Sequence, residues 1–218
     1  PHLLIAGQSG SGKSVLIQSL VASLVRFHGP DAIRFTLIDP KRVTFVGAAF
    51  RAAVSAHLEG PIRFDIEEVL PVIRELVDMM EERYRLFERA QVIDLDEYNE
   101  QAAAPERLER RVLVIDEFQD LVTDKAAAKE FFAGIKRLGA KARAAGVHLV
   151  LATQRPDKDT VPPVVKANLG ARIALQVSSQ PNSRIILDQV GAERLLGKGD
   201  LLANLGKGVV RAQGPLLG

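Results

Sequence analysis

The first chemically informative stretch of the sequence is GQSGSGKS, at residues 7–14. It fits the pattern G-x-x-x-x-G-K-[ST], in which glycines let backbone N–H groups close around phosphate oxygens. Here Lys13 would reach the β and γ phosphates and share in catalysis, while the hydroxyl of Ser14 would bind Mg²⁺. A Gly/Ser-rich turn is the alternative, but the motif lies between a strand-like run and a helical pattern, as a phosphate loop requires. The sequence therefore predicts a site for ATP and Mg²⁺. Its nucleotide-binding residues are Gln8, Ser9, Gly10, Ser11, Gly12, Lys13, Ser14 and Val15.

A second chemical feature is the adjacent carboxylate pair Asp116 and Glu117, which directly follows the apolar residues 112–115. Open parallel sheets bind their ligands at the carboxyl ends of the strands, where this pair is expected. Asp116 suits a magnesium ligand, and Glu117 suits the general base that polarises the attacking water. The alternative is an acidic turn after a core strand, and the presence of the phosphate motif argues against it. The pair indicates hydrolysis of the nucleotide rather than sensing alone.

A third polar cluster ends the apolar run 149–152, which continues as Thr153, Gln154, Arg155 and Pro156. If this run is a neighbouring parallel strand, Gln154 lies near the γ-phosphate. An amide can hydrogen-bond both phosphate and water, so Gln154 is a candidate sensor of hydrolysis. Pro156 restricts Arg155 to extended conformations, which directs the next loop away from the sheet. An ordinary polar strand end is the alternative.

These side chains need strands that end at one edge of a common sheet. Short apolar runs typical of buried strands occur at residues 3–6, 35–38, 112–115, 147–152 and 173–177. Stretches with helical spacing of apolar residues lie between or after them, at 14–27, 66–90, 126–145 and 183–189. This alternation indicates an α/β fold with a mostly parallel central sheet and helices on both faces. We expect one domain, residues 1–218.

Composition limits the classes of partner and location. The formal net charge of +2 is too mild to indicate nucleic-acid binding without a locally basic surface. The absence of cysteine excludes disulfides and thiolate metal sites. No apolar run reaches the roughly 18 residues of a membrane span, so no membrane contact is expected of this chain. Because Pro1 stands immediately before a strand-like run, we expect a fragment of a longer cytoplasmic protein, with any membrane anchor carried elsewhere.

Taken together and in order, six segments resemble the motor domain of the FtsK/SpoIIIE DNA translocases, within the HerA–FtsK group of RecA-like ATPases. They read PHLLIAGQSGSGKS, LIDPKR, VLVIDEFQDLV, KARAAGVHLVLATQRP, VKANL and ARIALQVSSQPNSRIILDQVGAERLLGKGDLL. The likeness extends from Pro1 to about Leu202, and its fourth and sixth segments are more specific than the phosphate motif. The resemblance implies a RecA-like P-loop NTPase fold. It also implies a homo-oligomeric ring, usually a hexamer, around double-stranded DNA, with ATP between neighbouring subunits.

The resemblance also implies roles for single residues. Asp116 and Glu117 take the Walker-B positions, and Gln154 takes the sensor position. Arg143, in KARAAG, matches the catalytic arginine that such rings offer to the nucleotide of the next subunit, where it stabilises transition-state charge. Arg137, on the same predicted helix, is the second candidate. A solvated helix face is the alternative for both arginines.

The family's DNA-facing cations fall on Arg155, Lys166 and Arg184. Phosphate contacts need only flexible cations that face the backbone, and three per subunit would make a basic channel in a nearly neutral protein. Ordinary surface cations are the alternative. The sequence departs from the family at Gln180, where many relatives carry lysine, and in the shorter spacing between the two Walker motifs. These departures leave the subfamily open.

The leading prediction for function is an ATP-hydrolysing motor that translocates double-stranded DNA through an oligomeric ring. A second hypothesis keeps the motor but makes polypeptide its cargo, since related ATPases power protein export. A third is a nucleotide-binding assembly module that does not translocate, against which Asp116, Glu117 and Gln154 argue.

Overall fold

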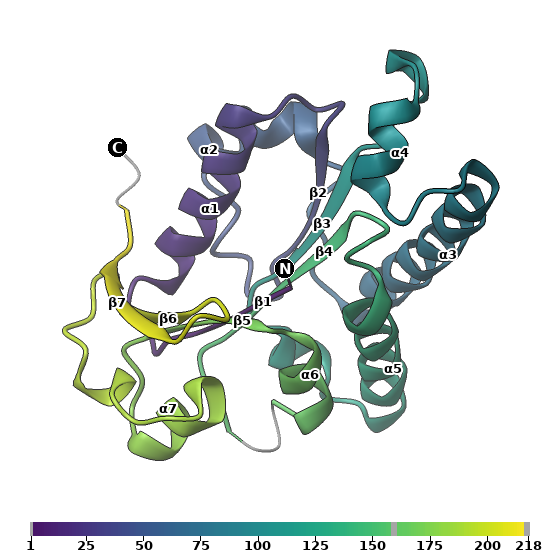
Figure 1. Ribbon diagram of the computed structural model, residues 1–218. Helices are drawn as coiled ribbons and strands as arrows, with labels where there is room; N and C mark the ends of the chain where they lie inside the picture. The colour runs from purple at the N-terminus through teal and green to yellow at the C-terminus, as the bar shows by residue number, and fades with distance from the viewer. Residues whose placement is uncertain (1, 158–160, 216–218) are drawn as a thin grey trace.

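One mixed sheet organises the molecule, drawn in Figure 1 from a computed structural model that describes residues 2–157 and 161–215. Within those residues seven strands pair in the order β2-β3-β4-β1-β5-β6-β7. The strands are β1 (Leu3–Ala6), β2 (Ile33–Ile38), β3 (Arg110–Ile115), β4 (Val147–Thr153), β5 (Ala171–Leu175), β6 (Asp200–Asn204) and β7 (Val209–Gln213). Strands β1 to β5 run parallel to one another, whereas β6 and β7 pair in antiparallel fashion. The carboxyl ends of five strands therefore meet at one edge.

Helices cover both faces of this sheet. They are α1 (Lys13–Phe27), α2 (Ala48–Val54), α3 (Ile66–Ala90), α4 (Leu95–Gln101), α5 (Lys125–Lys141), α6 (Pro163–Asn168) and α7 (Gln180–Leu187). Helices α1 and α2 pack on one face, and α3 and α5 pack on the other (Figure 1). The predicted α/β fold, a mostly parallel sheet covered on both faces, is confirmed.

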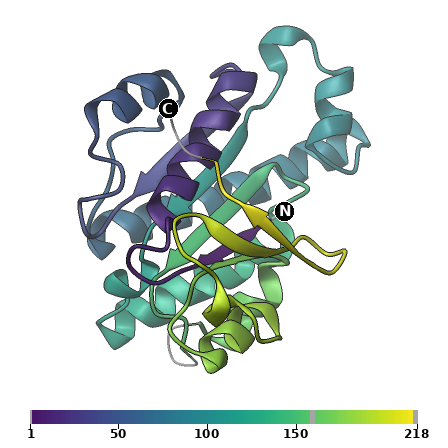
Figure 2. The ribbon, with the colours of Figure 1, turned by 90° about the vertical axis from the view of Figure 1, so that its left-hand side faces the viewer.

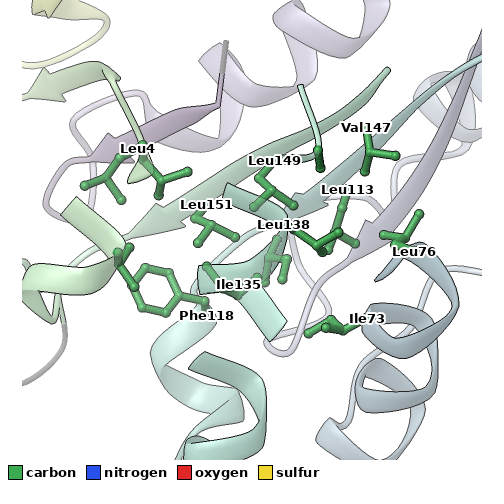
Figure 3. Packing of buried hydrophobic residues seen from close by; sticks show 14 of the residues in the cluster. Leu4, Ile73, Leu76, Leu113, Phe118, Ile135, Leu138, Val147, Leu149 and Leu151 are labelled. Carbon is green, nitrogen blue, oxygen red and sulfur yellow. The ribbon is translucent and has the colours of Figure 1, made fainter. Parts of the chain in front are cut away.

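Two hydrophobic clusters form the core, one on each face of the sheet. Because successive side chains of a strand point to opposite faces, Val112 and Val114 contribute to one cluster and Leu113 to the other. Figure 3 shows the second cluster, in which Ile73 and Leu76 of α3 and Ile135 and Leu138 of α5 pack against β3 and β4. Burial on both faces explains the continuous apolar runs of the central strands.

The β6–β7 hairpin closes the sheet beside the start of α1 (Figures 1 and 2). The hydroxyl of Ser19, on α1, donates to the carbonyl of Pro215, which follows β7, at 3.4 Å. The Gly199 N–H, just before β6, donates to the Ser11 carbonyl at 2.8 Å. The last strands are thereby attached to the loop that precedes α1.

Among the predicted boundaries that differ from the structure, the end of α5 differs most, because the helix ends at Lys141 rather than near residue 145. Residues 142–146 form a turn, closed where the Val147 N–H donates to the Ala142 carbonyl at 2.9 Å. Gly146 adopts φ 74° there, and a Cβ atom at this position would lie 2.4 Å from Leu95. The tight return to β4 thus leaves the helix no room to continue. Helices α2, α4 and α6 are short and were not predicted.

No helix in the described parts of the chain is long and apolar enough to span a membrane.

Candidate active site

The loop between β1 and α1 is held by backbone hydrogen bonds to both neighbouring strands. The Gly7 N–H donates to the Thr153 carbonyl at the end of β4 at 3.1 Å, and the Gln8 N–H donates to the Gln176 carbonyl just after β5 at 2.8 Å. Two of the loop's glycines, Gly10 and Gly12, have φ of 80° and 99°, which residues with a Cβ atom rarely adopt. The loop therefore turns sharply into the first turn of α1, where free N–H groups attract anions.

Lys13 and Ser14 open α1 and meet Asp116 from the end of β3. The Lys13 ammonium group pairs with Asp116 Oδ1, and both side chains are buried. The hydroxyl of Thr44, in the turn after β2, donates to Asp116 Oδ2 and lies 3.1 Å from Ser14 Oγ. Three oxygen-bearing side chains thus gather at one point, and oxygen atoms are the ligands that Mg²⁺ prefers.

Glu117 is buried directly behind Asp116 and is held by the end of β4. The Thr153 hydroxyl donates to Oε1 at 3.2 Å, and the Gln154 N–H lies 3.0 and 3.1 Å from the two carboxylate oxygens. Lys41 Nζ lies 3.2 Å from Oε2. Glu117 itself has φ 59°, a left-handed conformation that costs energy for a residue other than glycine. The strained backbone and the surrounding donors fix the orientation of this carboxylate.

A cavity of about 590 Å³ extends from this loop along the start of α1. Seven of the eight predicted nucleotide-binding residues line it: Gln8, Ser9, Gly10, Gly12, Lys13, Ser14 and Val15. The eighth, Ser11, is fully buried beneath the loop, where its carbonyl accepts the Gly199 N–H. Gln154, the candidate sensor, lines the same cavity as the loop.

The residues present fit a magnesium nucleotide. A Cβ atom on Gly12 would lie 2.6 Å from the Gly199 backbone nitrogen, so this part of the cradle is built for glycine. Ser14 and Asp116 are the side chains that would hold Mg²⁺, and the Thr44 hydroxyl is hydrogen-bonded to both. Lys13, which lines the cavity, is within reach of phosphate if it leaves Asp116.

Sequence reasoning missed the turn after β2, which contributes Asp39, Lys41 and Thr44. Asp39 is fully buried, and its Oδ2 accepts the N–H groups of Thr44 and Phe45 at 2.8 and 3.0 Å. The signal was present, because β2 is a parallel neighbour of β3 and ends in Asp39-Pro40 at the same edge. The carboxyl-edge rule applied to Asp116 therefore also covers this turn.

Sequence reasoning also missed the far wall of the cavity, which comes from the C-terminal part of the chain. Lys198 and Gly199 lie before β6, Gln213 ends β7, and Gly214 and Pro215 follow it. The Gly214 N–H donates to the Gly199 carbonyl at 2.7 Å, which joins the two segments. Only the glycines of GKGD gave a signal, and glycine alone does not indicate a ligand.

Arg143 lies in the turn before β4, at the edge of the sheet opposite the loop that carries Lys13. Its side chain is exposed, and it forms no ion pair with any residue in 2–157 or 161–215. Seven residues of β4 separate this turn from Gln154, a span of roughly 20 Å at the usual rise of a strand. Arg143 therefore cannot reach the nucleotide site of its own chain. Arg137 instead pairs with Glu81 of α3 at 2.9 Å.

Two of the three predicted DNA-contacting cations come together. Lys166 of α6 and Arg184 of α7 line one cavity of about 640 Å³, and the Lys166 ammonium group also pairs with Asp188. The hydrogen bond from Lys166 holds the pKa of Asp188 below its usual value, helped by Arg172. Arg155 is exposed and is not among the described residues that line this cavity. Its N–H donates to Thr153 Oγ1 at 3.1 Å, which joins it to the support of Glu117. Residues 158–160, on the loop behind it, lie outside the described residues.

Comparison with known proteins identifies related sequences. The family model described as the FtsK/SpoIIIE family matches residues 1–158. The DNA translocase FtsK of Treponema pallidum (strain Nichols) is 44% identical over 206 residues, which are 93% of this chain and 25% of that protein. The chain thus spans about a quarter of the length of the curated relatives it matches.

Two solved structures share the fold over nearly the whole chain. The pCW3 conjugation coupling protein TcpA, in a monomer form with ATPgS, superposes with a TM-score of 0.84 at 28% identity, over 98% of this chain and 59% of that one. The cytoplasmic domain of the Thermomonospora curvata type VII secretion ATPase EccC gives 0.80 at 28% identity, over 100% of this chain and 25% of that one. These matches support a P-loop ATPase that binds nucleotide.

Proposed function

Because the chain belongs to the FtsK/SpoIIIE family, as its sequence predicted, we propose that it is the motor domain of an ATP-driven translocase of double-stranded DNA. The observation that carries this proposal is the convergence of Lys13, Asp116, Glu117 and Gln154 at one edge of the sheet, beside a cavity lined by the phosphate loop. These residues come from three separate strand ends. Their convergence is what a site for hydrolysis needs and what a binding module does not.

Each of these side chains has a distinct role in the proposed reaction. Lys13 leaves Asp116 to bind the β and γ phosphates, and Ser14 and Asp116 hold Mg²⁺. When bound, Mg²⁺ neutralises charge on the phosphate oxygens. Glu117 accepts a proton from the attacking water. Gln154, whose N–H already donates to Glu117, presents its side-chain amide to the same cavity.

The DNA surface is proposed to comprise Arg155, Lys166 and Arg184. Lys166 and Arg184 border one cavity, a placement that supports a shared phosphate contact. Arg155 is linked to the catalytic centre, because the Thr153 hydroxyl both accepts from the Arg155 N–H and donates to Glu117. A movement of Glu117 would therefore be transmitted to the backbone of Arg155 through the Thr153 side chain alone.

A ring is proposed because Arg143 faces away from its own nucleotide site. Placed at the opposite sheet edge and exposed, it is available to the nucleotide of a neighbouring copy. Its charge would there stabilise the transition state. A hexamer is the ring size that the family suggests.

A second candidate function keeps the motor and makes polypeptide its cargo. It is favoured by the similarity to EccC, whose name describes a secretion ATPase. The higher identity to DNA translocases, 44% against 28%, and the cationic pair Lys166 and Arg184 favour DNA.

One experiment separates these functions: the ATPase rate measured against protein concentration, alone, with duplex DNA and with an unfolded polypeptide. We expect the rate per subunit to rise with concentration, since Arg143 acts between subunits, and to rise further with duplex DNA. Stimulation by polypeptide but not by DNA would reverse the assignment of cargo. No hydrolysis at any concentration, with nucleotide bound, would refute the motor.

A further inference from the structure

Lys41 is a second lysine at the catalytic edge, and the sequence motifs assign it no role. It lies in the turn after β2, with Nζ 3.2 Å from Glu117 Oε2 and 3.7 Å from Asp120 Oδ2. Its side chain is 37% exposed, whereas that of Glu117 is 3% exposed. The buried Glu117 carboxylate is thus paired with a lysine that remains partly exposed to solvent.

The two lysines of the site approach their carboxylates from different directions. Lys13 pairs with Asp116 and also lines the nucleotide cavity, so a phosphate can take it from Asp116. Lys41 is not among the described residues that line this cavity. The phosphates of a bound nucleotide would therefore compete with Asp116 for Lys13, but they would leave the pair between Lys41 and Glu117 in place.

A charge partner matters for Glu117 because burial of an unpaired carboxylate is costly. The other donors to Glu117, the Thr153 hydroxyl and the Gln154 N–H, are neutral. Both belong to the end of β4, on one side of the carboxylate. Lys41 comes from the end of β2 and adds the positive charge that these donors lack.

We propose that Lys41 is a positioning residue for ATP hydrolysis, which balances the charge of Glu117 and fixes its orientation toward the attacking water. This inference rests on the proposed function, in which Glu117 is the general base. Misplacement of a catalytic group by about 1 Å costs up to about 10²-fold in rate. Loss of one of several supports of Glu117 is therefore expected to lower kcat by about 10-fold or more.

The test compares Lys41→Met and Lys41→Arg in the assembled motor with duplex DNA. For Lys41→Met we expect the loss in kcat, with KM and the Kd of a fluorescent ATP analogue changed by less than about two-fold, because Lys41 does not touch the nucleotide. Lys41→Arg, which keeps the cation, should recover most of the rate. Arg42→Met is the matched control, since Arg42 is the next residue but pairs with Asp65 at 3.6 Å and stacks on Phe64.

The decisive measurement is a double-mutant cycle with Glu117→Gln. If Lys41 acts through Glu117, then Lys41→Met has little further effect in the Glu117→Gln background. An equal fold loss in both backgrounds, or a wild-type kcat for Lys41→Met, would overturn the proposal, as would a loss in which Kd rises in parallel. If Glu117→Gln itself leaves turnover unchanged, it is the proposed hydrolytic mechanism that fails.

Discussion

At the scale of single residues, the site contains two lysine–carboxylate pairs on adjacent acidic residues. Lys13 pairs with Asp116, and Lys41 pairs with Glu117. Two neighbouring buried carboxylates would repel each other, and the two cations offset that repulsion. The pairs differ in what can break them, because phosphate competes only for Lys13. In the proposed reaction, phosphate would thus free Asp116 to hold Mg²⁺ while Lys41 keeps Glu117 in place.

Replacement of Glu117 by glutamine tests the proposed general base. The amide keeps the size of the side chain but cannot accept the proton of the attacking water, so turnover should fall by at least about 10². Binding of ATP should persist, because Glu117 is buried and is not among the described residues that line the nucleotide cavity. Steady-state ATPase rates and equilibrium nucleotide binding check both parts. Turnover within a few-fold of wild type would contradict the assigned role.

At the scale of elements, the site is made where five parallel strands end at one edge. The phosphate loop and Asp116-Glu117 were predictable, because each is encoded by a short local pattern directly after an apolar run. The position of Gln154 was predictable only because the apolar run before it was interpreted as a parallel strand of the same sheet. The end of α5 was not, since the pattern of apolar residues continues through the turn that Gly146 closes.

Contacts between distant segments account for what the sequence could not predict. Thr44 reaches Asp116 across 72 positions of sequence, and Gly199 reaches Ser11 across an even longer interval. Neither residue belongs to a pattern that demands a ligand, so only the order of strands in the sheet brings them to the site. The topology, with β1 between β4 and β5, was itself beyond what apolar periodicity specifies.

The junction of β1 and β4 gives a prediction on pH. His2 is buried, and its Nδ1 accepts the Leu149 N–H at 3.1 Å, which only the neutral ring can do. Burial lowers the pKa of His2 from its usual 6.5 to about 4, and the charge of Arg143 acts in the same direction. The unfolded chain then binds the proton more readily than the folded one, so the stability present above pH 6.5 is lost as pH falls toward 4. The loss should be about 3 kcal/mol.

Chemical denaturation at several pH values checks this, with His2→Asn as the comparison. Asparagine can accept a hydrogen bond from the same N–H but does not titrate. The free energy of unfolding should therefore fall less steeply between pH 6.5 and 4 in this variant. Some decline should remain, because burial also lowers the pKa of His148 to about 4. A substitution at the exposed His28 serves as control. An unchanged slope in His2→Asn would show that His2 does not govern this window.

At the scale of the whole molecule, a net charge of +2 can serve a DNA motor only if cations are concentrated where the duplex passes. Combined replacement of Arg155, Lys166 and Arg184 by alanine should weaken DNA binding equally for unrelated sequences. The salt dependence should flatten by about one unit of log–log slope for each DNA phosphate that the protein no longer neutralises. Among single variants, Arg184→Ala should have a larger effect than Lys166→Ala, since Asp188 already neutralises part of the Lys166 charge.

The matched control removes the same charge elsewhere on the surface. Arg26, Arg51 and Lys207 are exposed on other elements, and their combined replacement by alanine should leave the salt slope near that of wild type. Fluorescence anisotropy of labelled duplexes, at a series of salt concentrations, measures both sets. Equal effects of the two triple variants would mean that net charge, rather than the proposed surface, determines binding.

The last prediction concerns the proposed ring, in which Arg143 of one chain would complete the nucleotide site of its neighbour. Arg143→Ala should bind ATP normally and hydrolyse it about 10³-fold more slowly, the scale of losing an arginine supplied from a neighbour. Glu117→Gln should also be impaired, because it lacks the proposed general base. When the two variants are mixed, some interfaces join an intact Glu117 to an intact Arg143, and ATPase activity should return in a fraction of the sites. Arg137→Ala, whose side chain pairs with Glu81 within its own chain, is the control and should retain activity. If Arg143 acted within its own chain, the mixture would stay as inactive as its components. In that case the separation of roughly 20 Å between Arg143 and Gln154 of the same chain could not persist in the working motor.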